Sequence, residues 1–322
     1  MLSASHVKQL AAELGFSACG LAPAVPVDSG RAAELRRWLA EGCQADMHYL
    51  EGNLDKRLNP CLLVEGAKTV VSLAVNYYSS QVPPASGSAY RLARYAYGTD
   101  YHEVVKQLLR RLMQQLGLEE GRDGRVFVDT APIDEKYWAQ QCGLGWRGRH
   151  SQLILPRAGS YFFLGELVLV HPADAYDAPM QSHCGNCRRC IDACPTGALR
   201  GDGTLDARLC LSYLTIEQRG DLPAEAAEGM GHCFYGCDRC AEACPWNERF
   251  ARNTEVEELQ PRPTLLCMDK ADWQQLTREQ YTEIFRKSAV KRAKWEGLAR
   301  NLEAVRQNLA AQGDEAAQEG EE

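Results

Sequence analysis

Residues 184–195 read CGNCRRCIDACP, and residues 237–245 read CDRCAEACP. The second run aligns residue for residue with the end of the first in its cysteines and proline, so the chain contains an internal repeat. In two-cluster ferredoxins, cysteines spaced in this way wrap a loop around one four-iron cluster, and the last cysteine, followed by proline, binds the other cluster. Zinc sites use four-ligand groups such as paired C-x2-C and do not explain both runs. The repeat therefore predicts two 4Fe-4S clusters.

The alignment of the two runs assigns all but one of the cluster ligands. The first cluster takes Cys184, Cys187, Cys190 and Cys244, and the second takes Cys194, Cys237, Cys240 and one more cysteine. Cys210 begins a predicted helix over 210–217 and is the preferred remaining ligand. Cys233 is the alternative ligand. Three residues separate it from Cys237, however, whereas only two separate the corresponding cysteines, Cys184 and Cys187, of the first run.

The composition favours metal binding over disulfide bonding. The chain has 322 residues, a net charge of −7 and 14 cysteines. A disulfide framework requires an oxidising compartment and is typical of small secreted chains. The N-terminus lacks a basic region followed by an apolar run, and the longest apolar stretches, near 70–75 and 161–170, are too short to span a bilayer. We expect a cytoplasmic protein without a membrane partner, whose scattered cysteines are ordinary core thiols.

Hydrophobic periodicity predicts a mixed α+β fold. Helices are expected over 3–14, 30–41, 100–116 and 133–142, and strands over 18–21, 68–77 and 125–129, with 153–155 and 161–170 as paired strands. We expect an α/β domain over 1–175, a ferredoxin-like domain over 176–255 and a basic helical segment over 256–311. The acidic tail, 312–322, is expected to be disordered.

The segment from Ile284 to Arg300 is strongly basic for an acidic chain. It contains Trp295, a single acid, Glu296, and the bases Arg286, Lys287, Lys291, Arg292, Lys294 and Arg300. A local cluster of cations with an aromatic residue is typical of a surface that binds phosphates, and RNA loops are read by stacking and phosphate contacts. The alternative is an ordinary solvated helix face.

Motifs along nearly the whole chain, from about residue 5 to 308, resemble the epoxyqueuosine reductase family. They are Lys56-Arg57-x2-Pro60, Tyr95-Ala96-x-Gly98-x-Asp100-Tyr101-His102, Val128-Asp129-Thr130-Ala131-Pro132, Gly143-Leu144-Gly145-Trp146-x-Gly148-Arg149, Phe163-Leu164-Gly165-Glu166, both cysteine runs and Phe285-Arg286-x-Ser288-Ala289-x-Lys291-Arg292. The resemblance implies a first domain that binds cobalamin in a fold related to reductive dehalogenases, and a ferredoxin-like domain that feeds it electrons.

The resemblance also implies a reaction and its partners. Epoxyqueuosine at the wobble position of tRNAs for Tyr, His, Asp and Asn would be reduced to queuosine, the final step of queuosine biosynthesis, as two electrons and two protons remove the epoxide oxygen as water. The implied partners are the tRNA anticodon stem-loop and an external electron donor, such as a flavodoxin or ferredoxin system. We expect a monomer.

The same resemblance assigns roles to individual residues. Asp129 would be the proton donor; its alternative is a turn former at the end of a predicted strand. The implied cofactor contacts are Arg57, Asp129, Leu153, Ser212, Gln218 and Asp238, and the resemblance favours Cys210 over Cys233 as the remaining cluster ligand. Asp134 stands where the family usually has Leu, and we expect it to stabilise the start of a helix. We expect structural roles for His102 and His150.

Two other functions share parts of this pattern. A reductive dehalogenase would also use cobalamin and two clusters, but the missing export signal and the basic segment from Ile284 to Arg300 argue against it. A non-catalytic electron carrier would need the clusters alone, and it predicts neither cobalamin uptake nor RNA binding.

Overall fold

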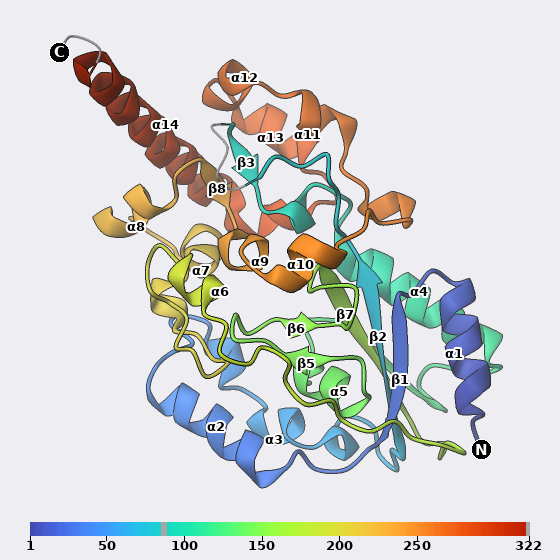
Figure 1. Ribbon diagram of the computed structural model, residues 1–322. Coiled ribbons are helices and arrows are strands. Elements are labelled where there is room, and N and C mark those ends of the chain that lie inside the picture. Colours follow the sequence, from blue (N-terminus) through green and yellow to red (C-terminus); the bar gives the residue numbers. More distant parts are fainter. Residues whose placement is uncertain (85–88, 320–322) are drawn as a thin grey trace.

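A four-stranded sheet forms the centre of the first half of the chain (Figure 1). The computed structural model describes residues 1–84 and 89–319, with side chains described to residue 310. The strands are β1 (Ala18–Pro23), β2 (Thr69–Asn76), β4 (Gly124–Phe127) and β7 (Phe162–Leu169), in the order β1-β2-β7-β4. All neighbours are antiparallel. The expected mixture of helix and sheet is confirmed, and the main sheet is antiparallel throughout.

The sheet is covered by helices on both faces. Alternate residues of β2 point to opposite sides, with Val71 and Leu73 in one apolar core and Val70 and Ala74 in the other. Helices α1 (Ala4–Glu13) and α4 (Tyr101–Gln115) cover the first side. Helices α2 (Ser29–Ala40), α3 (Leu54–Arg57) and α5 (Glu135–Gln141) belong to the second side. Burial on both faces explains the nearly continuous apolar run predicted as a strand at 68–77.

The expected pairing of 153–155 with 161–170 is wrong. The strand β6 (Leu153–Ile154) pairs with β5 (Trp146–Arg147), whereas β7 lies between β2 and β4. All residues of β7 after the first are buried, so an apolar strand of this length is accommodated in the middle of the main sheet.

A second apolar core contains a segment from the first half of the chain together with residues from the C-terminal part. Val82 and residues between 90 and 97 pack with residues between 207 and 305, and β3 (Arg91–Leu92) pairs in parallel with β8 (Cys233–Tyr235). The helices in this region are α7 (Leu211–Ile216), α8 (Ala224–Gly229), α11 (Pro263–Cys267), α12 (Lys270–Gln274), α13 (Arg278–Ile284) and α14 (Lys294–Glu319). The expected boundaries at 175 and 255 therefore do not separate independent cores.

Short helices carry the cysteine runs and the connections. They are α6 (Arg189–Asp192), α9 (Arg239–Glu242) and α10 (Pro245–Phe250), with 3-10 turns at His48–Leu50, Pro60–Leu62, Arg94–Ala96, Ala207–Leu209, Glu257–Leu259 and Ala289–Ala293. The helix α14 projects from the body in Figure 1. Its backbone continues as helix to Glu319, into the tail expected to be disordered, where Ala, Gln and Glu favour helix. Among the described residues, no helix is long and apolar enough to cross a membrane.

Candidate active site and cluster ligands

A cavity of about 510 Å3 lies beside Asp129, against α2, α3 and α5. Its volume is in the range of small-molecule sites. Two of the residues implied as cofactor contacts, Arg57 and Asp129, line it. Its apolar lining includes Leu35, Trp38, Leu50, Ile133 and Leu205, and its ionisable lining includes Arg31, Glu34, Arg57, Asp129, Asp134, Glu135, Lys136 and Arg147.

Asp129 is held in an unusual backbone conformation. The strand β4 ends at Phe127, and Asp129 follows with a φ of 50°, in the left-handed region that non-glycine residues rarely adopt. Its backbone N–H donates a short hydrogen bond to the Glu135 carboxyl group in the first turn of α5. Strained backbone of this kind is concentrated at functional sites. The turn therefore gives independent support for a functional role at this position.

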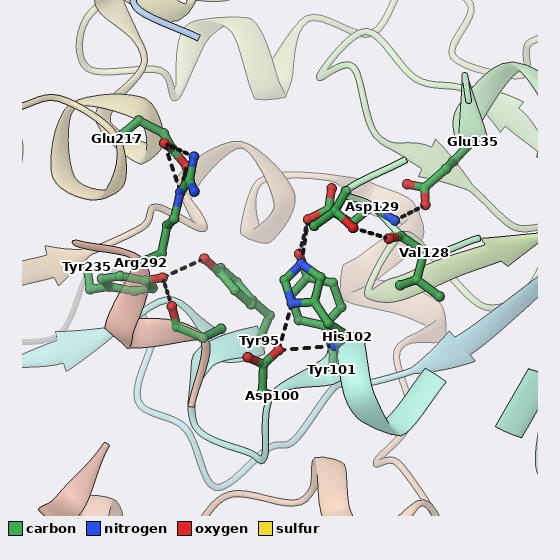
Figure 2. A network of polar contacts seen from close by, with 12 residues as sticks. Tyr95, Asp100, Tyr101, His102, Val128, Asp129, Glu135, Glu217, Tyr235 and Arg292 are labelled. Atoms are coloured by element: carbon green, nitrogen blue, oxygen red, sulfur yellow. Dashed lines mark hydrogen bonds and ion pairs between the residues drawn. The ribbon is translucent and has the colours of Figure 1, made fainter. Parts of the chain in front are cut away.

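The Asp129 carboxyl group meets the start of α4 (Figure 2). Its Oδ2 atom lies 2.6 Å from the Tyr101 hydroxyl and 2.9 Å from His102 Nε2. The other ring nitrogen of His102, Nδ1, lies 2.7 Å from Asp100, the residue that caps α4. The Tyr101 ring stacks on Phe163 of β7 with 4.1 Å between ring centroids. The residues from 100 to 102 therefore form a rigid support for Asp129.

The sequence interpretation of His102 as purely structural was incomplete. Its ring bridges the cap of α4 and the carboxyl group lining the cavity, 27 residues later in the chain. Tyr101 and Glu135, which were assigned no role, also contact Asp129. The motif Asp100-Tyr101-His102 was visible in the sequence, but its contact with the loop after β4 depends on the tertiary fold.

Burial and hydrogen bonding shift the pKa values of Asp129, His102 and Glu135 in different directions or by different causes. Burial opposes the charge on Asp129, but hydrogen bonds from His102 and Tyr101 outweigh it and lower the pKa. Burial favours neutral His102, yet the hydrogen bonds to Asp100 and Asp129 raise its pKa to about 9. Burial, followed by the charge of Asp129, raises the pKa of Glu135 to about 8. At neutral pH, Asp129 is ionised and lies between protonated His102 and neutral Glu135.

The rim of the cavity is fixed by ion pairs that include Asp134. The Asp134 carboxylate accepts a 2.7 Å hydrogen bond from Arg31 and also caps α5, as expected for an acid at a helix start. Arg31 also pairs with Glu34, which accepts two 2.6 Å hydrogen bonds from Arg147. Asp134 thus serves to position α2 against α5.

Among the residues that the structure describes, two polar atoms at the cavity have no protein partner. The Nε atom of Arg57 and the hydroxyl of Ser151 are buried without a hydrogen bond. Unsatisfied buried polar atoms are rare in folded proteins and indicate a missing ligand or water. Together with the apolar lining, these atoms fit a large ligand that has both apolar surface and hydrogen-bonding groups.

The four cysteines predicted for the first cluster surround one cavity. Cys184, Cys187, Cys190 and Cys244 line a space of about 90 Å3, together with His150 and Trp246. Among the residues that the structure describes, no three His, Cys, Asp or Glu side chains are arranged to hold a single metal ion. A four-iron cluster does not require that arrangement, because each cysteine binds a different iron. The donor set and the space fit such a cluster.

The four cysteines predicted for the second cluster influence one another. Burial raises the pKa of the Cys240 thiol, and the charges of Cys210, Cys194 and Cys190 raise it further. The pKa of Cys237 is also raised, by burial and then by Cys233, Cys240 and Cys210. The interaction of Cys240 with Cys190 indicates that the two sets are adjacent.

Cys210 and Cys244 occupy equivalent structural positions. Each is the residue before a short helix, α7 for Cys210 and α10 for Cys244. In each case, backbone N–H groups of the next residues lower a thiol pKa that burial raises. Free N–H groups at a helix start stabilise a thiolate. Cys233, in contrast, lies in β8 and donates to the carbonyls of Tyr235 and Gly236.

The second cysteine set lies next to the cavity. The Lys136 ammonium, which lines the cavity, lowers the pKa of Cys210, although burial raises that pKa overall.

The scattered cysteines are not all core thiols: Cys43 and Cys142 are buried and Cys19 and Cys61 are half-buried, but Cys267 is exposed.

Comparisons with known proteins agree with this arrangement. A family model described as epoxyqueuosine reductase QueG, DUF1730, matches residues 57–130, and one described as a 4Fe-4S double cluster binding domain matches residues 183–247. The chain is 43% identical over 302 residues to epoxyqueuosine reductase of Cyclobacterium marinum, covering 93% of this chain and 96% of the relative. This chain belongs to the epoxyqueuosine reductase family.

Solved structures of epoxyqueuosine reductases share the fold. One contains an epoxyqueuosine-modified tRNA-Tyr stem loop; it has a TM-score of 0.84 and 26% identity, covering 94% of this chain and 80% of that chain. Another, from Bacillus subtilis, has its aspartate-bearing catalytic loop swung out of the active site; it has a TM-score of 0.83 and 26% identity, covering 94% and 81%. The expected family membership and enzyme class, an oxidoreductase of tRNA modification, are confirmed.

Four of the residues that the epoxyqueuosine reductase resemblance implied as cofactor contacts do not line the cavity. Leu153 is buried in β6, Ser212 lies in α7, and the Gln218 amide donates to the carbonyl of Asp221. Asp238 is buried, where it accepts from the Arg91 guanidinium at 2.5 Å and from the Arg94 backbone at 2.8 Å. These contacts give Asp238 a structural role, and a cofactor role for all four residues stays a prediction.

The basic segment from Ile284 to Arg300 divides into exposed and structural cations. Arg286, Lys287, Lys291 and Lys294 are exposed. The Arg300 guanidinium donates to the carbonyls of Leu214, Gln218 and Gly220, so it holds the fold together. Arg292 pairs with Glu217 at 2.7 Å and lies over the ring of Tyr49, which lines the cavity (Figure 2). The segment therefore reaches the cavity mouth.

Proposed function

We propose that this chain reduces epoxyqueuosine to queuosine at the wobble position of tRNAs for Tyr, His, Asp and Asn, with Asp129 delivering the protons. The observation that carries the proposal is the position of Asp129: a strained turn places this residue in the lining of a cavity, and His102 holds its carboxyl group. The aspartate-bearing catalytic loop of the related Bacillus subtilis enzyme supports this role.

The residues that would hold the redox groups follow from the fit described above. Cys184, Cys187, Cys190 and Cys244 would bind one 4Fe-4S cluster, and Cys194, Cys210, Cys237 and Cys240 the other. Arg57 and Ser151 would bind cobalamin, through their unpaired polar atoms in the cavity. When bound, the clusters supply single electrons and cobalamin supplies a strong reductant at the epoxide.

The protein must also supply protons. Converting the epoxide to an alkene and water consumes two electrons and two protons, and the first proton goes to the oxygen as its bond to carbon breaks. Asp129 is ionised at neutral pH, so it needs a proton from a neighbour. The His102 Nε2–H group, 2.9 Å from Asp129 Oδ2, can provide it, and Asp100 stabilises the imidazolium. Glu135 holds a second proton on the other side of Asp129.

Binding of tRNA is supported by the charged surface at the cavity mouth. The exposed cations Arg286, Lys287, Lys291 and Lys294 belong to the same segment as Arg292, which reaches the cavity lining at Tyr49. The solved complex of a family member with a modified stem loop supports the same partner for this chain. An external flavodoxin or ferredoxin donor, a monomeric state and a cytoplasmic location stay predictions.

Mass spectrometry of nucleosides tests the reaction. Anaerobically purified protein, loaded with iron, sulfide and cobalamin and chemically reduced, is incubated with tRNA that carries epoxyqueuosine. We expect queuosine to appear as epoxyqueuosine disappears. The control is the same tRNA carrying only the precursor without the epoxide, which should not change. Absence of conversion by fully loaded protein would refute the proposed function.

A further inference from the structure

A second hollow lies behind the loop that carries Asp129. It has a volume of about 390 Å3 and is formed by α3, α4 and the edge strand β4. It shares Asn53, Thr130 and Pro132 with the cavity described above, so the two spaces lie on either side of these residues. An occupant of the hollow would therefore lie next to the catalytic loop.

In the described part of the chain, three cationic side chains and no acidic side chain line the hollow. Lys56 comes from α3, Lys106 from α4 and Arg125 from β4. Its other lining residues are Asn53, Leu63, Val126, Phe127, Val128, Thr130, Ala131 and Pro132. In a chain with a net charge of −7, this is a local concentration of positive potential.

Among the described residues, none of these three cations is paired with an acid, although a neighbour on the same helix is. Among the described residues, neither Lys56 nor Lys106 forms an ion pair with an acid. The Arg125 guanidinium lies over the Phe127 ring and makes one long contact, 3.4 Å, with the Leu63 carbonyl. One turn along α4 from Lys106, Arg110 pairs with Glu120 at 2.8 Å. Bringing three like charges together costs free energy that a bound anion would offset.

We propose that the hollow made by Lys56, Lys106 and Arg125 binds a phosphodiester group of the tRNA substrate. The proposal rests on the proposed function, because the base that reaches Asp129 brings the backbone of its own strand next to the loop. Lysine ammonium groups and an arginine suit phosphate oxygens, and the Thr130 hydroxyl adds a hydrogen-bonding group. The phosphodiester of the cobalamin nucleotide tail has the same chemistry, so the test separates the two sources.

The test compares two triple variants of the full chain. The first is Lys56→Ala/Lys106→Ala/Arg125→Ala, and the control is Arg36→Ala/Arg37→Ala/Arg111→Ala, which removes exposed cations that line neither space. Binding of a fluorescent anticodon stem-loop is measured by anisotropy from 50 to 200 mM salt. Losing the contact to this one phosphodiester should reduce the slope of log affinity against log salt by about 0.7, which is the contribution of one phosphate in single-stranded nucleic acid. Iron content and circular dichroism verify that each variant is folded. If the triple variant does not fold, the double variant Lys56→Gln/Lys106→Gln replaces it in the same measurements.

The outcomes assign the ligand. A smaller salt slope with unchanged cobalamin affinity, measured by absorbance titration, supports the RNA phosphodiester. Weaker cobalamin binding with an unchanged salt slope overturns the RNA assignment in favour of the cofactor tail. Unchanged binding of both ligands overturns the site. If the unaltered protein neither binds nor converts the tRNA, the proposed function itself fails, which is a different result.

Discussion

The two halves of the chemistry are encoded differently in the chain. The cluster ligands come from two short runs, and seven of the eight follow from local spacing alone. The proton site brings together Asp100 and His102 from the start of α4, Asp129 from the loop after β4 and Glu135 from α5. Metal ligands can thus be recognised from spacing, whereas a proton relay depends on which elements the fold places side by side.

The largest expected effect tests the one ligand that spacing left open. Cys210→Ala should lose one cluster, so that iron falls from about eight to about four atoms per chain, and tRNA reduction should stop. Cys233→Ala is the matched control and should keep all the iron, because the Cys233 thiol donates to the carbonyls of Tyr235, the last residue of β8, and Gly236. Iron is measured by colorimetric assay, and the opposite pattern would make Cys233 the ligand.

A second large effect separates a structural from a cofactor role at Asp238. Asp238→Ala leaves the fully buried Arg91 guanidinium without its 2.5 Å partner. Leaving a buried charge without any partner costs about 3–5 kcal/mol; because Arg91 keeps its ion pair with Glu242 at 3.1 Å, we expect a loss at the lower end of this range, which urea denaturation can measure. If Asp238 instead binds cobalamin, the variant would keep its stability and lose cofactor affinity.

The fold was predictable where local chemistry determines it. The helix start at Asp100 and the buried strand at 68–77 are both present in the structure. The pairing of β7 and the packing of Val82 and residues 90–97 in the C-terminal core were not predictable, because both depend on contacts between residues distant in sequence. The resemblance to the family identified Asp129, but its hydrogen bond with His102 could be recognised only from the tertiary structure.

A moderate effect tests the relay itself. His102→Gln keeps a hydrogen-bonding side chain but cannot carry a proton, so tRNA reduction at pH 7 should slow by about 10- to 100-fold. His171→Gln is the control, because His171 also contacts an aspartate, Asp123 at 2.8 Å, but lines neither space beside the Asp129 loop. An unchanged rate in the His102 variant would remove the relay.

The pH profile sharpens the same test. The pKa values of Glu135, about 8, and His102, about 9, are raised, so both groups hold their protons at neutral pH and lose them as the pH rises. The rate of the unaltered protein should therefore be highest near neutral pH and fall between about pH 8 and 9. In His102→Gln only the step near pH 8 should remain. A rate that rises with pH would contradict the scheme.

The smallest effect concerns the exposed part of the basic segment. Arg286→Ala/Lys291→Ala should weaken binding of the stem-loop by a few-fold at 100 mM salt, and the effect should diminish as salt increases. Removing Arg36 and Arg37, which are equally exposed on α2, is the control. Equal losses in both variants would indicate non-specific attraction.

The most direct test of the account is single-turnover reduction of epoxyqueuosine-tRNA by Asp129→Asn protein. Asparagine preserves the size of the side chain but cannot pass a proton, so the rate should fall by about 100- to 10,000-fold while iron content, cobalamin binding and tRNA affinity stay unchanged. Asp55→Asn, at an exposed position of α3, should keep the full rate. Full activity of the Asp129→Asn protein would contradict the central claim that this carboxyl group delivers the protons.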